Sequence, residues 1–142
     1  MNTINQILDA KGHDVWSIGP EATVYDAIAL MAEKGIGALL VTDAGKPVGI
    51  ISERDYARKV ILKDKSSKET KIKDIMTSSI VFASSTQTVE KCMAIMTENH
   101  IRHLPVTEDG QVCGMIAIGD LVKSIIADQK FQIEQLEHYV SG

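Results

Sequence analysis

The chain has 142 residues, of which 44% are hydrophobic and 24% are charged, and these proportions are typical of a globular protein rather than a disordered or fibrous one. Its net charge of −4 disfavours non-specific binding to nucleic acid, which needs a basic surface. No apolar run approaches the roughly 20 residues of a membrane-spanning helix, and the N-terminus lacks the apolar run of a signal peptide. We therefore expect a cytoplasmic protein with no membrane partner.

The residue pattern in the first half of the chain predicts a series of short helices and strands. Residues 4–8 place apolar groups three and four apart, as one helical turn does. An extended piece follows at 15–18, and then an amphipathic helix at 24–34 with Thr23 as its N-cap. Strands are expected at 38–42 and 48–52, joined by a turn at Gly45. A last helix begins near Asp55.

The second half repeats this order. Residues 15–61 align with residues 80–126 at a constant shift of 65, without a gap, and 14 of the 47 positions are identical. The repeat predicts an extended piece at 80–83, a helix at 89–99 behind Thr88, strands at 104–107 and 113–117, and a helix from about Asp120. We therefore expect an α+β fold of two tandem β-α-β-β-α units related by a pseudo-two-fold axis.

The divisions that follow are residues 4–62 for the first unit, 63–71 for a charged, solvated linker, 72–127 for the second unit and 128–142 for a helical extension. Apolar residues of the C-terminal segment mark one face at helical spacing: Val122, Ile125, Ile126, Ile133, Leu136 and Val140. This face must pack on the body or on another chain, and we favour a contact between subunits.

Few residues suggest catalysis or metal binding. The chain has no glycine-rich phosphate loop and no nucleophile elbow. Cys92 and Cys113 form no Cys-x-x-Cys pair and are expected to be reduced thiols. His100 and His103 lack a third ligand nearby, so no metal site is predicted. We predict that the chain is not an enzyme and uses no catalytic cofactor.

A repeated motif ends both units. Gly49-Ile-Ile-Ser-Glu-Arg-Asp55 and Gly114-Met-Ile-Ala-Ile-Gly-Asp120 each carry a strand into a helix, with an aspartate at the junction. The aspartate is either a helix N-cap or a carboxylate that accepts the two hydroxyls of a ribose. The two junctions are chemically unequal, because Arg102 and His103 stand where the first unit has Gly37 and Ala38. Arginine and a titratable imidazole are suitable partners for phosphates. Alternatively, Arg102 and His103 are simply solvated residues at the start of a strand.

These motifs, together with Ile101-Arg-His-Leu-Pro-Val106, resemble a tandem pair of CBS domains, the regulatory module named after cystathionine β-synthase. The resemblance covers about residues 4–126 and is closest to stand-alone bacterial pairs. It implies that the repeats dock through their sheets, that AMP, ADP, ATP, NAD or S-adenosylmethionine binds in clefts between them, and that the chain forms a homodimer.

The resemblance also implies the residues that bind the ligand. The Asp120 site would take Arg102, His103, Met115 and the segment Lys11-Gly12-His13, with Arg54 reaching its phosphates. The Asp55 site would take Ser52, Ile50, Gly37, Ala38, Thr77 and Ser78. Ala117 departs from the Ser/Thr that the family has at this position, and Gly119 offers no cation. The Asp120 site is expected to be the stronger phosphate site.

Three hypotheses follow. The leading one is a non-catalytic sensor of adenine nucleotides that acts on an unknown regulated protein. The second is an interaction module that binds no nucleotide and acts through its C-terminal helix. An enzyme that acts on a nucleotide is the third, and nucleic-acid binding at a local patch of Arg54, Arg58 and Lys59 is a minor alternative.

Overall fold

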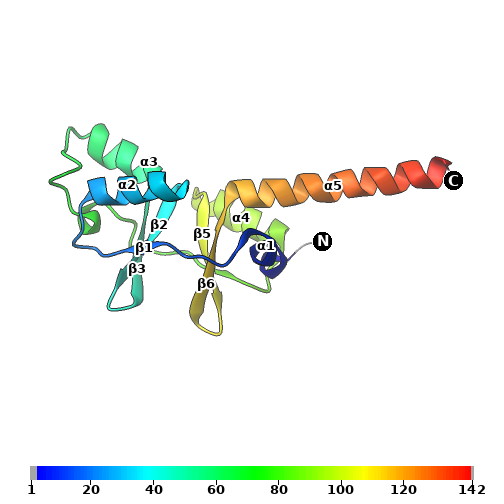
Figure 1. Cartoon of the computed structure of the whole chain (residues 1–142), viewed down its shortest axis with the longest axis horizontal. Helices are drawn as coiled ribbons and strands as arrows, with labels where there is room; N and C mark the ends of the chain where they lie inside the picture. The colour runs from blue at the N-terminus through cyan, green and yellow to red at the C-terminus, as the bar shows by residue number, and fades with distance from the viewer. Residues whose placement is uncertain (1–2, 142) are drawn as a thin grey trace. The chain divides into compact units, whose positions relative to one another are not determined.

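A computed structural model describes residues 3–141 of the chain, which divide into two compact units. Within the described residues, unit 1 comprises residues 3–14 and 82–141, and unit 2 comprises Val15–Val81. The colour ramp in Figure 1 shows how unit 1 combines the first residues of the chain with its second half. Each unit has its own three-stranded sheet.

Unit 2 contains, in chain order, β1 (Ser17–Ile18), α2 (Val24–Lys34), β2 (Ala38–Asp43), β3 (Lys46–Ser52), α3 (Glu53–Tyr56), the π-helical turn η1 (Ala57–Ile61) and the 3₁₀ turn η2 (Ile72–Asp74). The sheet order is β1-β2-β3, with β1 parallel to β2 and β2 antiparallel to β3. Ala44 and Gly45 both have positive φ, which is the geometry of a tight hairpin turn.

Unit 1 contains α1 (Ile4–Lys11), β4 (Ala83–Ser84), α4 (Val89–Asn99), β5 (His103–Glu108), β6 (Gln111–Ala117) and α5 (Ile118–Ser141). Its sheet has the order β4-β5-β6 and the same parallel and antiparallel pairings as the sheet of unit 2. The predicted α+β class and the repeated order of elements are confirmed.

The predicted bounds agree best with the structure for the helices α2 and α4. Both begin and end at the predicted residues, and the side chains of Thr23 and Thr88 accept hydrogen bonds from the backbone as N-caps. The hairpin strands are longer than expected, whereas the predicted extended pieces form strand only at 17–18 and 83–84. The last helices begin at Glu53 and Ile118, before the two aspartates.

The apolar segments that precede the two repeats belong to opposite units. Helix α1 precedes the first repeat but packs in unit 1, where Ile4 N–H donates to the Gln87 carbonyl at 2.9 Å. Residues 72–76 precede the second repeat but pack in unit 2, where Ile72 and Ile75 join the core. The compact units therefore differ from the stretches 4–62 and 72–127 that the repeat suggested.

Residues 63–71 are mostly exposed, as a solvated linker should be. They are nevertheless tied to unit 2, because the carbonyls of Ser67 and Thr70 accept hydrogen bonds from the first N–H groups of α2, at Tyr25 and Val24. Lys71 and Lys73 bind Glu21 at 2.8 and 2.9 Å and hold the pKa of its carboxyl at about 2. The segment thus supplies partners to helix donors that have none within the helix.

Each core lies between a hairpin and its helices. In unit 2 the fully buried residues include Val24, Leu39 and Ile51, and in unit 1 the equivalent residues Val89, Leu104 and Ile116 are 2% exposed or less. Cys92 is buried and Cys113 half-buried, and both are free thiols. The described residues include no helix long and apolar enough to cross a membrane.

Candidate functional site: two strand-to-helix junctions

The second strand of each hairpin runs directly into a helix, β3 into α3 and β6 into α5. The residue before the hairpin receives the first helical N–H: the Gly37 carbonyl accepts from Glu53 at 3.0 Å, and the Arg102 carbonyl accepts from Ile118 at 2.8 Å. Ala38 faces Ser52 across the hairpin of unit 2, and His103 faces Ala117 in unit 1. The predicted equivalence of the two sites therefore holds for the backbone.

In unit 2 the aspartate completes a capping box. Ser52 is the N-cap of α3, and its hydroxyl accepts the Asp55 N–H at 3.2 Å. The Asp55 carboxylate accepts in return from the Ser52 N–H at 3.0 Å and from its hydroxyl at 3.1 Å. Lys59, one turn later, lies 3.1 Å from the second carboxylate oxygen and donates to the Ile75 carbonyl at 2.9 Å.

In unit 1 the aspartate is held from two directions. One carboxylate oxygen of Asp120 accepts from the Ala117 N–H at 2.8 Å and from Lys11 Nζ at 2.6 Å. Lys11 also donates to the Met115 carbonyl at 2.8 Å. The structure thus brings Lys11, Met115 and Asp120 together, as the family resemblance implied.

Both aspartates accept a backbone N–H at the start of their helix, as the capping alternative expected, but they do so from inside the helix and not from the cap position. Ser52 occupies the cap position of α3, and Asp55 is the third residue of the helix. Asp120 is likewise the third residue of α5. A carboxylate at this position reaches back to the N–H of the cap residue, which is the reciprocal half of a capping box, and it also suits the positive end of the helix.

Helix α1 delivers Lys11 to Asp120 through its last turn. Gly12 follows with φ of 116°, a conformation that favours glycine, and its N–H donates to the Leu8 carbonyl at 2.7 Å. His13 binds the Asp9 carboxylate at 2.9 Å and the Cys113 carbonyl at 3.0 Å. These hydrogen bonds raise the pKa of His13, the one to Asp9 most, and they engage both of its ring nitrogens.

His103 is half-buried where β5 starts, and Arg102 beside it is exposed. Burial lowers the pKa of the His103 imidazole, and the positive charge of Lys11 lowers it further. The burial of His103 therefore disfavours the charged form of its imidazole, whose ring nitrogens can form hydrogen bonds. Lys11 and Arg102 bring basic side chains to this junction.

In unit 2, the backbones of Ile50 and Thr77 exchange two hydrogen bonds of 2.9 Å, so the predicted pair lies together beside β3. Ser78 follows as an exposed residue, and Ala38 is buried. Lys59 was missed, although its spacing of four residues from Asp55 on a helix indicates an ion pair. Arg54 lies on α3 of unit 2, and its predicted reach to the phosphates at Asp120 stays a prediction.

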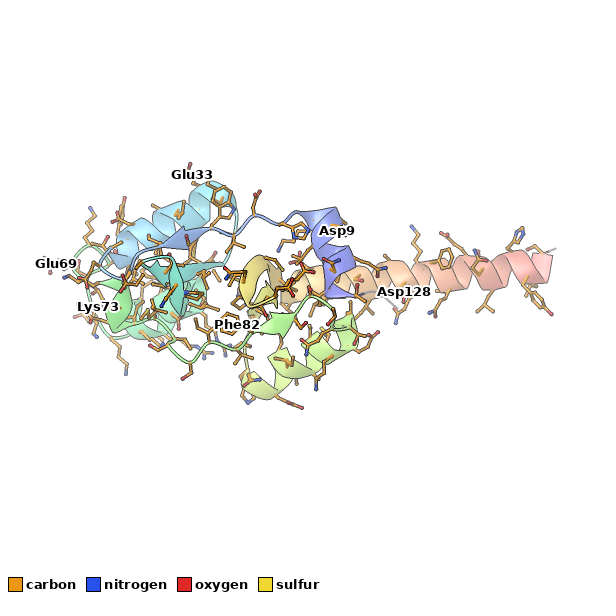
Figure 2. All side chains as sticks on the ribbon, turned by 90° about the horizontal axis from the view of Figure 1, so that it is seen from below. Asp9, Glu33, Glu69, Lys73, Phe82 and Asp128 are labelled. Carbon is orange, nitrogen blue, oxygen red and sulfur yellow. The ribbon has the colours of Figure 1, made fainter. Side chains whose placement is uncertain are left out.

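The described residues 3–141 hold no group of three or more metal-ligating side chains. Figure 2 displays the side chains of both units, with Asp9 labelled on the helix that carries Lys11.

Comparison with known proteins gives concordant results. The CBS domain model matches residues 9–62 and 72–127. A mitochondrial CBS domain-containing protein of Arabidopsis thaliana is 37% identical over 99% of this chain and 72% of its own length. The solved structure of a protein from Burkholderia ambifaria, described as a signal-transduction protein with CBS domains, is 52% identical, covers 90% of this chain and 96% of that one, and superimposes with a TM-score of 0.87.

A more distant CBS domain pair has the same fold, with 23% identity, a TM-score of 0.80, and coverage of 90% of this chain and 98% of that one. It was solved in complex with 5′-methylthioadenosine and S-adenosyl-L-methionine. The CBS domain model matches both halves of the chain, and the relatives cover nearly all of it. This chain therefore belongs to the CBS-domain family and carries two CBS domains in tandem.

Proposed function

We propose that this CBS pair is a non-catalytic regulatory module that binds an adenine nucleotide or adenosyl compound at the Asp120 junction of unit 1. The observation that carries the proposal is the gathering of a carboxylate, two basic side chains and a half-buried imidazole where β6 enters α5, at Asp120, Lys11, Arg102 and His103.

The chemistry of this junction suits a nucleotide. The Asp120 carboxylate binds Lys11 and the Ala117 N–H through one oxygen, Oδ2, and a carboxylate oxygen is a strong acceptor for the paired hydroxyls of a ribose. Lys11 and Arg102 are suitable partners for phosphate, and the first turn of a helix favours anions. In our proposal Lys11 balances Asp120 in the free protein and moves its charge toward the phosphate when the ligand binds.

The likeness to a CBS pair that binds adenosyl compounds supports this class of ligand. AMP, ADP, ATP, NAD and S-adenosylmethionine all contain the adenosine group that Asp120 would hold. Because Lys11 and Arg102 favour phosphates, we rank the nucleotides above S-adenosylmethionine. We place the protein in the cytoplasm, where nucleotide levels report on the state of the cell, and we propose that it passes that information to a partner protein.

We rank the Asp55 junction as the weaker site. It has one lysine, Lys59, at the carboxylate, and Gly37 and Ala38 occupy the positions of Arg102 and His103. Ser52, Ile50, Thr77 and Ser78 complete it with neutral groups. A nucleoside or a ligand with less negative charge suits this junction better than a triphosphate does.

Isothermal titration calorimetry with AMP, ATP, NAD and adenosine tests the proposal, using the matched variants Asp120→Asn and Asp55→Asn. Asparagine keeps an acceptor for the Ala117 or Ser52 N–H and removes the charge. We expect Asp120→Asn to weaken AMP binding by roughly tenfold or more, since a charged hydrogen bond contributes about 1.5–3 kcal/mol. Asp55→Asn should leave that affinity nearly unchanged, and equal effects of the two variants would remove Asp120 from the site.

An interaction module that binds no nucleotide is the second candidate. It is favoured by the fact that both aspartates already have protein partners, Lys11 and Lys59, so that neither needs a ligand. A thermal-shift panel of adenine compounds separates the two candidates, because a ligand that binds the folded state must raise the melting temperature. A panel without any shift would favour the interaction module.

A further inference from the structure

Helix α5 presents an apolar stripe to solvent along its length. The stripe consists of Val122, Ile126, Ile133, Leu136 and Val140, with exposed fractions of 41%, 58%, 56%, 64% and 84%. Figures 1 and 2 both show α5 extending away from the other elements of unit 1, and every described residue after Asp128 is exposed. A row of large exposed apolar side chains on one helix face marks a surface made for contact.

The stripe is separate from the face by which α5 packs on its own unit. Leu121 is fully buried and Ile125 is half-buried, whereas their neighbours Val122 and Ile126 are exposed. The helix therefore has one face for the core of unit 1 and another for a partner. Substitutions in the stripe can change association without removing side chains from the core.

The spacing of the stripe fits a helix as the partner. Val122, Ile126, Gln129, Ile133, Leu136 and Val140 follow one another in alternating steps of four and three residues, which is the heptad pattern of a coiled coil. Ile126, Ile133 and Val140 take the a positions, and Val122, Gln129 and Leu136 take the d positions. A second helix with the same pattern offers complementary knobs and holes.

The charged side chains beside the stripe indicate which partner fits it and whether the two helices run parallel or antiparallel. Lys130 and Glu137 flank the stripe on one side, at e positions, while Gln132 and Tyr139 flank it on the other. In an antiparallel pair centred between Glu134 and Gln135, Ile133 of each copy lies beside Leu136 of the other. Lys130 of each copy then faces Glu137 of the other, which gives two opposite-charge contacts, whereas a parallel pair would place Gln132 opposite Glu137.

Residues 128–142 contain three carboxylate side chains and a single lysine, and this balance disfavours an anionic membrane surface as the partner.

We propose that the distal half of α5 pairs antiparallel with the same segment of a second copy of this chain, through Ile133, Leu136 and Val140 of the stripe and the Lys130–Glu137 contacts. The proposal does not depend on nucleotide binding at Asp120.

Charge-reversal variants of the full chain test the partner and the direction together. Lys130→Glu places two acidic groups at each Lys130–Glu137 contact, and Glu137→Lys places two basic groups there. Each variant alone should associate more weakly than the wild type, by roughly tenfold in dissociation constant. A mixture of the two variants restores opposite charges at both contacts, so sedimentation equilibrium should show a mixed dimer. A mixture no tighter than the separate variants would overturn the proposal.

Substitution in the stripe tests the contact itself. Leu136→Asp should weaken self-association by roughly tenfold or more, since it places a charge in the apolar seam. Phe131→Ala, on the opposite side of the helix, is the matched control and should leave the dissociation constant unchanged. Circular dichroism and the melting temperature of each variant report whether the units remain folded. An unchanged dissociation constant for a folded Leu136→Asp protein would overturn the proposal, as would an equal loss in Phe131→Ala.

Cysteine cross-linking fixes the direction separately. In the antiparallel pair Gln129 lies beside Val140 of the other copy, so mixing Gln129→Cys with Val140→Cys protein should give a disulfide between chains under mild oxidation. Val140→Cys alone should give little, and the wild type controls for Cys92 and Cys113. Efficient cross-linking of Val140→Cys alone would show a parallel pair and overturn the antiparallel assignment.

Discussion

The two strand-to-helix junctions have the same backbone and the same aspartate, yet the carboxylates are neutralised in different ways. Asp55 pairs with Lys59, one turn away on its own helical segment, whereas Asp120 pairs with Lys11, which lies 109 residues away in the sequence. The first arrangement is local. The second ties α1 to the start of α5, so any ligand that competes for Lys11 or Asp120 acts on the contact between two elements of unit 1.

This comparison shows what duplication preserves. Hydrogen bonds between backbone groups recur in both units, as do the threonine caps of the central helices. The side chains around the aspartates differ, because Arg102 and His103 replace Gly37 and Ala38. The shared backbone forms the junction, and the side chains determine which ligand it suits.

The largest effect is expected where the leading segments pack on the sheets. A Cβ added at Gly114 would lie 2.6 Å from Leu8, and one added at Gly49 would lie 2.6 Å from Met76, so the two side chains have equivalent places. Leu8 is fully buried, whereas Met76 is half-buried. Leu8→Ala should lower the free energy of unfolding by about 3 kcal/mol, and Met76→Ala by about half as much. Urea denaturation measures both, and equal losses would show that the two segments are energetically alike.

A smaller effect of opposite sign in the two units should follow from the capping residues. Ser52→Ala removes one half of the capping box of α3 and should cost about 1 kcal/mol. Ala117→Ser introduces the missing hydroxyl before α5 and should stabilise unit 1 by up to about 1 kcal/mol. Hydrogen exchange of the amides at each helix start resolves the two changes. A loss of protection in Ala117→Ser would show that the junctions differ in backbone as well as in side chains.

The smallest effect concerns the two histidines of unit 1. Burial lowers the pKa of His103, and hydrogen bonds to Asp9 and Cys113 raise that of His13. The unfolded chain therefore binds a proton at His103 more readily than the folded chain does. Protonation of His103 favours unfolding, so its contribution to the free energy of unfolding is present above pH 6.5 and is lost as the pH falls below that value. His13 acts in the opposite direction and, being exposed, acts weakly.

Proton NMR titration resolves the two imidazoles, with the midpoint of His103 expected below 6.5 and that of His13 above it. AMP should raise the midpoint of His103, because a nearby phosphate favours the imidazolium. A midpoint for His103 above that for His13 in the free protein would contradict the burial described for the Asp120 junction.

Much of the fold could be predicted from the repeat, because the periodicity of 24–34 and 89–99 and their threonine caps are local signals. The proximity of Lys11 and Asp120 could not be predicted from spacing, since it depends on tertiary packing, and it was expected only from the family resemblance. The place of each aspartate as the third residue of its helix was missed because the helices begin two residues earlier than expected. The repeat also could not show which unit each leading segment joins, since that depends on tertiary packing.

The crossed assignment of those leading segments has a consequence for any attempt to divide the protein. A fragment that ends at residue 71 contains α1 without the sheet on which it packs, and it lacks Ile72 and Ile75 from its own core. The complementary fragment has those two residues but loses Ile4 and Leu8 from the interior of unit 1. Neither copy of the repeat is self-sufficient, and only the unbroken chain supplies each unit with all of its parts.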